Sequence, residues 1–179
     1  VLALKRWLAG QPQPALDTIG SAEHLALAAS TAARATTLVR DHANLLPLRL
    51  PPGARVAVVV PQSVDLTPAD TSSYIRCELA RAVRRYHPGA EEISIPADPS
   101  ESEVAAIRQR LAGYDLAIVG TINATAQPGQ AAVVNAALAD GIATVVAALR
   151  MPYDLAAFPS APTYLCSYSI LPPSVDALA

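Results

Sequence analysis

The amino-acid sequence predicts an α/β fold, a three-layer α/β/α sandwich around a mainly parallel sheet of five or six strands. The first observation is the run Arg55–Pro61, which is β-branched and apolar and shows no polar alternation. A strand covered on both faces needs no alternation. The second observation is that Leu116–Val119 and Ile142–Leu149 repeat this composition, each after a helical pattern. Strands that alternate with helices are joined by right-handed crossovers, which place helices on both faces of a parallel sheet.

The composition fits a well-packed core and excludes several classes of protein. Of the 179 residues, 52% are hydrophobic and 16% are charged, and the formal net charge is −2. A charge this small leaves no electrostatic footprint for nucleic acid. No apolar run reaches the roughly 18 residues that a membrane span requires. We therefore predict neither a nucleic-acid partner nor a membrane span.

The N-terminal part is predicted to be helical. Val1–Ala9 has an amphipathic pattern that ends at Gly10, and a proline-containing linker follows. Ser21 is then placed to cap a long alanine-rich helix, which we expect to run to about Asp41. Glu23 lies in the first turn of that helix, where the helix dipole favours an acidic side chain.

The middle of the chain continues the alternation of strands and helices. After the first buried strand we expect a polar loop, Gln62–Thr71, and then a helix over Ser72–Tyr86. Glu92–Pro96 alternates polar and apolar residues, which is typical of a strand near the edge of a sheet. In the next helix, Ser100 and Glu103 form a capping box, in which each side chain satisfies the other residue's backbone N–H.

The last third repeats the pattern twice more. Asp115–Thr121 is predicted to be a buried strand. A helix follows, with Pro128 in its first turn and Gly141 at its C-terminal end. Ile142–Leu149 is the next buried strand. A long loop then leads to a final strand at Thr163–Ser169.

Two cysteines lie far apart in this pattern, Cys77 in a predicted helix and Cys166 in a predicted strand. We interpret both as buried free thiols, with a disulfide as the alternative. The sequence contains no Cys-x-x-Cys spacing and no histidine cluster, so it predicts no metal site. It likewise indicates no cofactor.

The motifs of common enzyme classes are missing. The first strand–helix turn contains no glycine, whereas a dinucleotide site needs several there so that the backbone can approach the pyrophosphate. No phosphate-binding loop and no Gly-x-Ser-x-Gly elbow occur in the sequence. His24, His42 and His87 lie on helices or helix ends and are interpreted as capping or solvent-facing residues. We therefore predict no catalytic residue in this chain.

Ligand sites of open α/β sheets lie at the carboxyl ends of the strands. The loops expected to meet there are Gln62–Thr71, Ile122–Gln127 and Arg150–Pro162. Their candidate site residues are Gln62, Asp65, Asn123, Arg150, Tyr153 and Asp154. The favoured interpretation is structural, with Arg150 and Asp154 paired to fix their loop and Tyr153 packed beneath them. The alternative is that these side chains face a ligand.

Two stretches resemble a known family. Thr37–Leu48, Thr-Leu-Val-Arg-Asp-His-Ala-Asn-Leu-Leu-Pro-Leu, resembles the segment that joins the two domains of glycoside hydrolase family 3 enzymes. Ala148–Leu155, Ala-Leu-Arg-Met-Pro-Tyr-Asp-Leu, followed by Tyr164–Tyr168, is similar to the second domain of that family. The Arg-x-Pro-Tyr-Asp pattern points to its bacterial β-N-acetylglucosaminidase branch. The resemblance extends from Ser21 to Ala179.

The resemblance implies a domain without a catalytic centre of its own. Retaining glycosidases need a nucleophile and an acid/base group close together. In the β-N-acetylglucosaminidase branch, both the Asp nucleophile and the His acid/base belong to an N-terminal TIM barrel. In β-glucosidase relatives the second domain supplies the acid/base Glu, and no loop Glu here has a matching context. Residues 1–20 would be the remnant of the last barrel helix plus a linker, and residues 21–179 the sandwich domain.

The implied partners are the TIM barrel of the same chain and, in the full-length enzyme, its carbohydrate substrate. One hypothesis is that the domain supports the barrel and forms part of its rim, with Arg150 and Asn123 directed toward the sugar. We also expect the isolated chain to self-associate through the face that meets the barrel. The resemblance fits a cytoplasmic or an exported bacterial protein alike.

Two functions from other classes remain as alternatives. The chain could be a stand-alone α/β binding or interaction module with no hydrolase activity. It could also be an independent carbohydrate-binding domain, which usually needs exposed aromatic residues. Trp7 is the only tryptophan, and we expect it to pack against other residues because it lies on the apolar side of the first helix.

Overall fold

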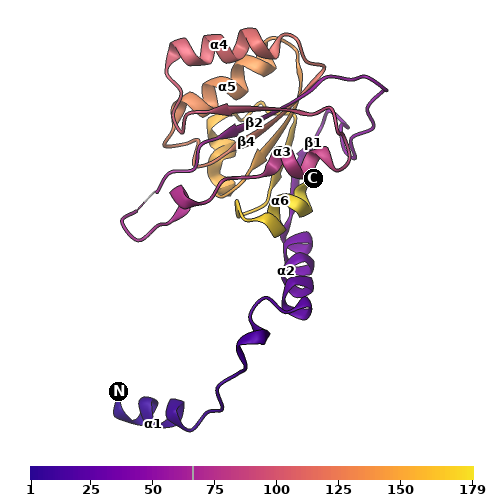
Figure 1. Ribbon diagram of the computed structural model, residues 1–179. Coiled ribbons are helices and arrows are strands. Elements are labelled where there is room, and N and C mark those ends of the chain that lie inside the picture. Colours follow the sequence, from indigo (N-terminus) through magenta and orange to yellow (C-terminus); the bar gives the residue numbers. More distant parts are fainter. Residues whose placement is uncertain (66) are drawn as a thin grey trace.

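The computed structural model describes residues 1–65 and 67–179, and its centre is a six-stranded sheet with the order β1-β6-β5-β4-β2-β3 (Figure 1). The predicted loop Gln62–Thr71 includes Leu66, which lies outside the described residues. Strand β1 pairs with β6 in the antiparallel sense, and every other pair is parallel. The strands are β1 (Thr37–Asp41), β2 (Val56–Pro61), β3 (Glu91–Ile95), β4 (Leu116–Thr121), β5 (Ala143–Ala148) and β6 (Thr163–Cys166).

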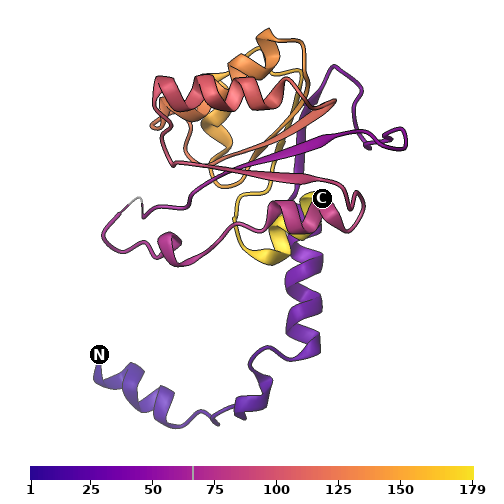
Figure 2. The ribbon, with the colours of Figure 1, turned by 45° about the horizontal axis from the view of Figure 1, so that its top comes forward.

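Helices cover both faces of this sheet, which confirms the predicted three-layer sandwich (Figures 1 and 2). Helices α4 and α5 lie on one face, and α3 and α6 lie on the other. The α-helices are α1 (Leu2–Ala9), α2 (Ala22–Ala35), α3 (Leu79–Arg84), α4 (Glu101–Leu111), α5 (Pro128–Ala139) and α6 (Pro172–Leu178). Short 3-10 turns are η1 (Leu16–Thr18), η2 (Ser72–Tyr74) and η3 (Pro152–Ala157).

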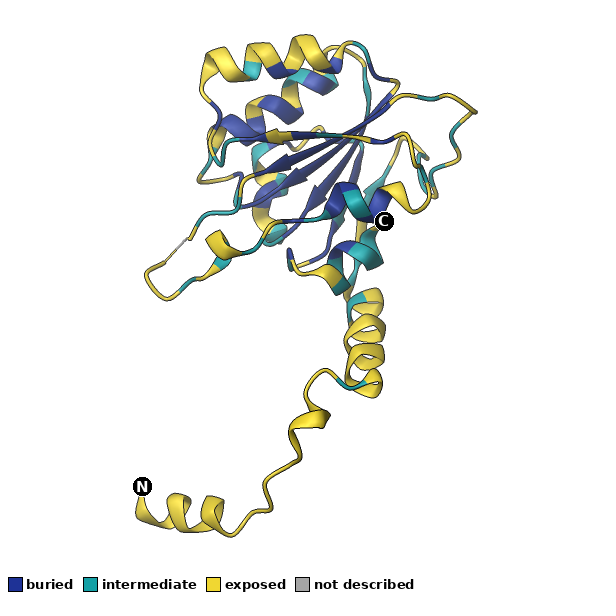
Figure 3. Cartoon of the chain, viewed as in Figure 1, coloured by how far each residue is buried: buried dark blue, intermediate teal, exposed yellow. Residues whose placement is uncertain are grey.

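The core lies on both sides of the neighbouring interior strands β2 and β4, all of whose residues are buried (Figure 3). Successive side chains of a strand point to opposite faces, so Val59 packs toward α4 and α5, whereas Val58 packs toward α3 and α6. Each valine buried in this way contributes about 1.5–3 kcal/mol. Burial on both faces explains why these strands show no polar alternation.

Several local predictions are confirmed. Ser21 caps α2 by accepting a hydrogen bond from the backbone N–H of His24. Ser100 and Glu103 form the predicted capping box of α4. Pro128 opens α5, and Gly141 follows that helix with φ +71°, a conformation that glycine adopts without strain. Strand β3 lies at the edge of the sheet, as its alternating pattern indicated.

The predicted helix from Ser21 to Asp41 is wrong in its second part. Helix α2 ends at Ala35, and Thr37–Asp41 forms the antiparallel edge strand β1. Asp41 accepts hydrogen bonds from Thr163 and from the backbone N–H groups of the following turn. The β-branched residues here prefer a strand. Hydrogen bonding to β6, which is distant in sequence, determines that these residues form a strand and not a helix.

The predicted helix over Ser72–Tyr86 is also shorter than expected. Only η2 and α3 are helical, and the link between them is extended at Ile75, with φ −111° and ψ 116°. Cys77, expected in a helix, lies in this link. Ser72 bonds to Asp70 through its backbone N–H and its hydroxyl, and such local side-chain bonds compete with helix formation.

Residues 1–35 form an arm that projects from the sandwich and touches it where α2 lies beside α6 (Figures 1 and 3). Neither α1 nor α2 contains a buried residue. Trp7, expected to pack against other residues, is 61% exposed. Other large apolar side chains exposed on the arm are Leu2, Leu4, Leu8, Leu16, Ile19, Leu25 and Leu27.

Helix α5 begins against the loop before α4, and this contact makes Gly129 sensitive to substitution. A Cβ atom at Gly129 would lie 2.1 Å from the backbone oxygen of Pro99. Alanine gains about 1 kcal/mol over glycine inside a helix. Overpacking against backbone costs about 1–3 kcal/mol or more, so this cost exceeds the gain in helix propensity.

We therefore expect Gly129→Ala to lower the free energy of unfolding by about 2 kcal/mol in urea denaturation. Gly89→Ala is the matched control, because a Cβ there would meet only the His87 side chain at 3.9 Å, an ordinary contact. Equal stability of the two variants would contradict the packing at Pro99.

Candidate functional site

A rim forms where the carboxyl ends of β2, β4 and β5 meet, and Arg150 ties two of its loops together. Arg150 follows β5, and its Nη1 donates to Asp70 Oδ2 and to Ser72 Oγ, both at 2.8 Å. The side chain of Asp70 is 10% exposed and that of Arg150 is 30% exposed. An ion pair with this much shielding is held more firmly than a surface pair. The loop after β2 is therefore fixed to the end of β5.

Asp154 ties the end of β4 to the same segment. It is completely buried, and its Oδ2 accepts a hydrogen bond of 2.7 Å from the hydroxyl of Thr121. Burial raises the pKa of Asp154, and this effect exceeds the opposite effects of Thr121 and of the backbone N–H groups of residues 123–125. Its Oδ1 has no hydrogen-bond partner of good geometry among the described residues.

A third bond holds the segment between these two residues. The hydroxyl of Tyr164 on β6 donates to the backbone oxygen of Pro152 at 3.1 Å. Tyr153, the next residue, is 69% exposed. Arg150, Pro152 and Asp154 are thus each hydrogen-bonded to another part of the fold, while Tyr153 points to solvent. The segment 150–154 is a rigid tie between three strand ends.

The favoured sequence interpretation of this segment is therefore wrong in two respects. Arg150 pairs with Asp70, not with Asp154. Tyr153 does not pack beneath the loop. The physical reason is that η3 begins immediately after Met151, which directs the side chains of residues 150 and 154 into different loops.

The remaining candidates lie at two places on the rim. Asn123 is half-buried and adopts φ +59° in the loop after β4, beside the Asp154 anchor. Gln62 is exposed and lies farther away, where β2 ends next to the edge strand β3. The bonds of Arg150 to Asp70 and Ser72, and of Asp154 to Thr121, were not predicted from the sequence. The Asp-x-Ser spacing of Asp70 and Ser72, typical of a side-chain-stabilised turn, was an available signal.

The acidic groups of the rim are occupied by the chain itself. Asp65 accepts hydrogen bonds from the backbone N–H and the hydroxyl of Ser73, at 2.8 and 2.9 Å. Asp70 receives Arg150 and Ser72, and Asp154 is buried. Each carboxylate thus fixes a loop. None of them faces another carboxylate in the arrangement that glycoside hydrolysis requires.

Other chemical groups offer little reactivity. Cys77 and Cys166 are free and buried, as predicted. Burial raises the pKa of Cys77 to about 11 and also raises the pKa of Cys166. Within residues 1–65 and 67–179, no three His, Cys, Asp or Glu side chains gather as metal ligands would. Helices in the same ranges are all too short or too polar to cross a bilayer.

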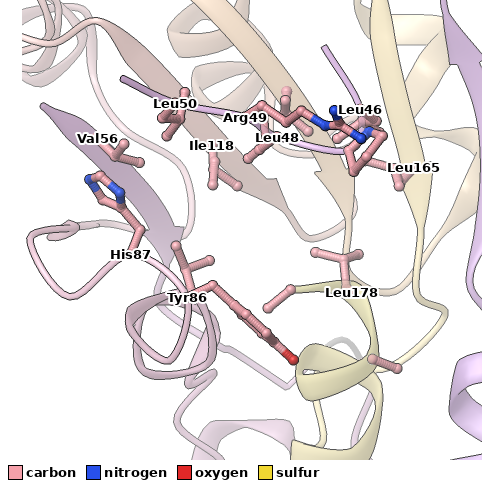
Figure 4. A pocket seen from close by; sticks show the side chains of 15 residues that line it. Leu46, Leu48, Arg49, Leu50, Val56, Tyr86, His87, Ile118, Leu165 and Leu178 are labelled. Atoms are coloured by element: carbon pink, nitrogen blue, oxygen red, sulfur yellow. The ribbon is translucent and has the colours of Figure 1, made fainter. Parts of the chain in front are cut away.

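A cavity of about 670 Å³ lies away from the rim, between α3, α6 and the segment Leu46–Leu50 (Figure 4). Its walls are mainly aliphatic and include Val56 of β2 and Ile118 of β4. His87 lies at its margin, with Nε2 2.9 Å from the backbone oxygen of Ala54. The imidazole of His87 is thus engaged with the backbone.

Comparison with solved structures identifies similar proteins. A β-N-acetylglucosaminidase of glycoside hydrolase family 3 from Paenibacillus sp. strain FPU-7 is 26% identical with a TM-score of 0.81, covering 99% of this chain and 34% of the other. A fungal multidomain β-N-acetylglucosaminidase of the family, which carries a GCN5-related glucosamine N-acetyltransferase region, is 27% identical with a TM-score of 0.75. That match covers 93% of this chain and 18% of the other.

A β-glucosidase from Listeria innocua, solved with isofagomine, shares the fold at 15% identity and a TM-score of 0.69, over 94% of this chain and 26% of its own. This chain therefore spans between 18% and 34% of the length of these enzymes. No protein-family model and no curated protein sequence matches it.

The pKa of Asp154 leads to a test by pH. Because that pKa is raised in the folded chain, the folded state loses stability as the pH rises through it. Asp154→Asn removes this loss. From about pH 4 upward we expect the stability of the variant relative to the parent to increase, by at most about 1.4 kcal/mol per pH unit.

Urea denaturation across this pH range measures the effect. Asp140→Asn is the control of opposite sign, because the hydrogen bond from Arg108 lowers the pKa of Asp140. Its stability relative to the parent should fall as the pH rises. The same sign for both variants would contradict the assignment.

Proposed function

We propose that this chain, an α/β sandwich domain of glycoside hydrolase family 3, is the non-catalytic C-terminal domain of a β-N-acetylhexosaminidase-like enzyme. The full-length enzyme would hydrolyse terminal β-linked N-acetylglucosamine. Two observations support this substrate class. The two β-N-acetylglucosaminidases are the neighbours above 25% identity among those described, and their likeness extends over nearly this whole chain.

One observation carries the non-catalytic assignment. The rim carboxylates Asp65, Asp70 and Asp154 are all engaged by their own loops or buried. Hydrolysis with retention needs a free nucleophile and an acid/base group across the scissile bond. Both groups would come from a barrel domain elsewhere in the protein. We expect this chain alone to cleave no glycoside.

The rim would face the mouth of that barrel. Tyr153 is exposed and Asn123 is half-buried, whereas Arg150 fixes the segment that carries Tyr153 to the loop after β2. This changes the role assigned to Arg150 at the level of sequence. It acts as a positioning residue, and Tyr153 with Asn123 would line the edge of the substrate site.

The arm supports the same arrangement. Residues 1–20 would be the end of the last barrel helix and a linker, and the barrel would cover the apolar side chains that α1 exposes. Leu4, Trp7 and Leu8 are each more than 60% exposed in the chain by itself. Exposed apolar surface of this kind marks an interaction site.

Kinetics of the full-length enzyme test the rim. We expect Tyr153→Ala to raise KM for an aryl β-N-acetylglucosaminide about threefold to tenfold, because a stacked aromatic ring contributes about 0.5–1.5 kcal/mol, with unchanged thermal stability. Arg150→Ala should raise KM and lower the melting temperature together, because two loops lose their tie. Tyr86→Ala, an exposed tyrosine at the end of α3, is the control. Unchanged KM and unchanged stability in both rim variants would contradict the proposal.

Light scattering tests the arm. We expect the 179-residue chain to self-associate as its concentration rises, because its apolar arm then has no barrel to cover it. A shorter chain, residues 21–179, should associate less over the same range, because it lacks the exposed side chains of α1 and keeps only Leu25 and Leu27 of the apolar arm. A strictly monomeric parent at high concentration would argue against the proposed role of the arm.

A further inference from the structure

A second hollow, of about 480 Å³, opens at the carboxyl ends of β2 and β3, on the face that α3 covers. It exists because α3 is short. The chain between β2 and α3 swings out as a long loop and returns in extended form, so no helix covers this corner of the sheet (Figure 1). The residues that matter for its chemistry are Gln62, Ser63, Tyr74, Arg76, Glu92 and Ser94.

Ser63 supplies an unsatisfied group in this hollow. Its Oγ is buried and has no hydrogen-bond partner among the described residues. A hydroxyl removed from water without a hydrogen-bond partner is destabilising, so a buried unsatisfied hydroxyl suggests a bound partner that the described part of this chain does not supply. The exposed side chains of Gln62 and Ser94 line the same hollow. Together they offer donors and acceptors of hydrogen bonds.

The charges of the hollow are already balanced. Arg76 Nη2 lies 2.9 Å from Glu92 Oε1, and the side chain of Glu92 is 19% exposed. A phosphate or another anion would have to compete with Glu92 for the guanidinium. A neutral ligand can instead accept from Arg76 and donate to Glu92 without breaking the pair.

Tyr74 adds an apolar surface at the margin. Its side chain is 88% exposed, the most of any tyrosine in the described residues. A sugar ring presents an apolar C–H face and a border of hydroxyl groups, which match an aromatic ring beside serine, amide and paired charged groups. The volume lies within the range of about 300–1,000 Å³ that is usual for small-molecule sites.

We propose that this hollow binds a neutral sugar, an N-acetylhexosamine unit of a glycan, with Tyr74 against the ring and Ser63 bonded to one of its polar groups. The choice of sugar rests on the proposed function. The hollow is distinct from the rim at Asn123 and Tyr153, which lies at the ends of β4 and β5. It would hold a part of the glycan that is not being cleaved.

The test is an amide NMR titration of the 179-residue chain with N,N′-diacetylchitobiose. We expect saturable shifts at Ser63, Tyr74 and Ser94, with a Kd of about 1 mM, since an open site gives weak binding. Tyr74→Ala should weaken binding about fivefold or more. Tyr86→Ala, at a tyrosine that is 75% exposed just after the C-terminal end of α3, should leave it unchanged.

Ser63→Ala separates ligand binding from a structural role. Because Ser63 Oγ has no partner within the described chain, its removal should leave the stability equal or higher. Binding of the disaccharide should nevertheless weaken about threefold or more. Absence of shifts, shifts confined to Asn123 and Tyr153, or unchanged affinity in Ser63→Ala would each overturn the proposal.

Failure here is distinguishable from failure of the proposed function. The titration reads binding by this chain and involves no hydrolysis. The KM of Tyr153→Ala in the full-length enzyme measures the contribution of the rim to substrate binding. If the disaccharide does not bind in the hollow, the kinetic test of the rim is unaffected. If the isolated chain cleaves a glycoside, the non-catalytic assignment is wrong, but the binding result for Tyr74→Ala is unaffected.

Discussion

Burial of β2 and β4 on both faces is the constraint on which the rest of this structure depends. Their valine and isoleucine side chains lie alternately on the two faces, so each face must be covered by helices. Helices α4 and α5 cover one face, and α5 begins so close to Pro99 that a Cβ atom at Gly129 has no room. The other face is covered by the short helices α3 and α6, and the cavity beside α6 and the hollow at Ser63 lie on that side.

The ties of the 150–154 segment follow from this framework. The parallel strands β2, β4 and β5 end at one edge, and the loops that follow them emerge there. Arg150 reaches the loop after β2, Asp154 anchors the end of β4, and Tyr164 holds Pro152 from β6. One short segment therefore keeps a rim rigid, while leaving Tyr153 exposed. Rigid presentation of a few outward side chains is what a domain beside an active site requires.

The exposed arm and the family likeness support the same view of the molecule. This chain covers about a third or less of its glycoside hydrolase family 3 neighbours, and its arm exposes leucines and a tryptophan, which is typical of an interaction surface. Its own carboxylates fix loops. The proposed division of labour places the reaction in the barrel and the shape of the rim in this domain.

The sequence by itself determined the sandwich, the buried strands, the capping box of α4 and the edge position of β3. These features depend on periodicity and on contacts between residues close in the chain. Only the tertiary structure decided that Thr37–Asp41 is a strand, that α3 is short, and that Arg150 pairs with Asp70. The short α3 follows a turn in which Ser72 bonds to Asp70, two residues away. The first and the last of these features depend on partners 80 or more residues away, Asp41 with Thr163 and Arg150 with Asp70. Local propensity contains no information about such partners, because they meet only after the sheet has formed.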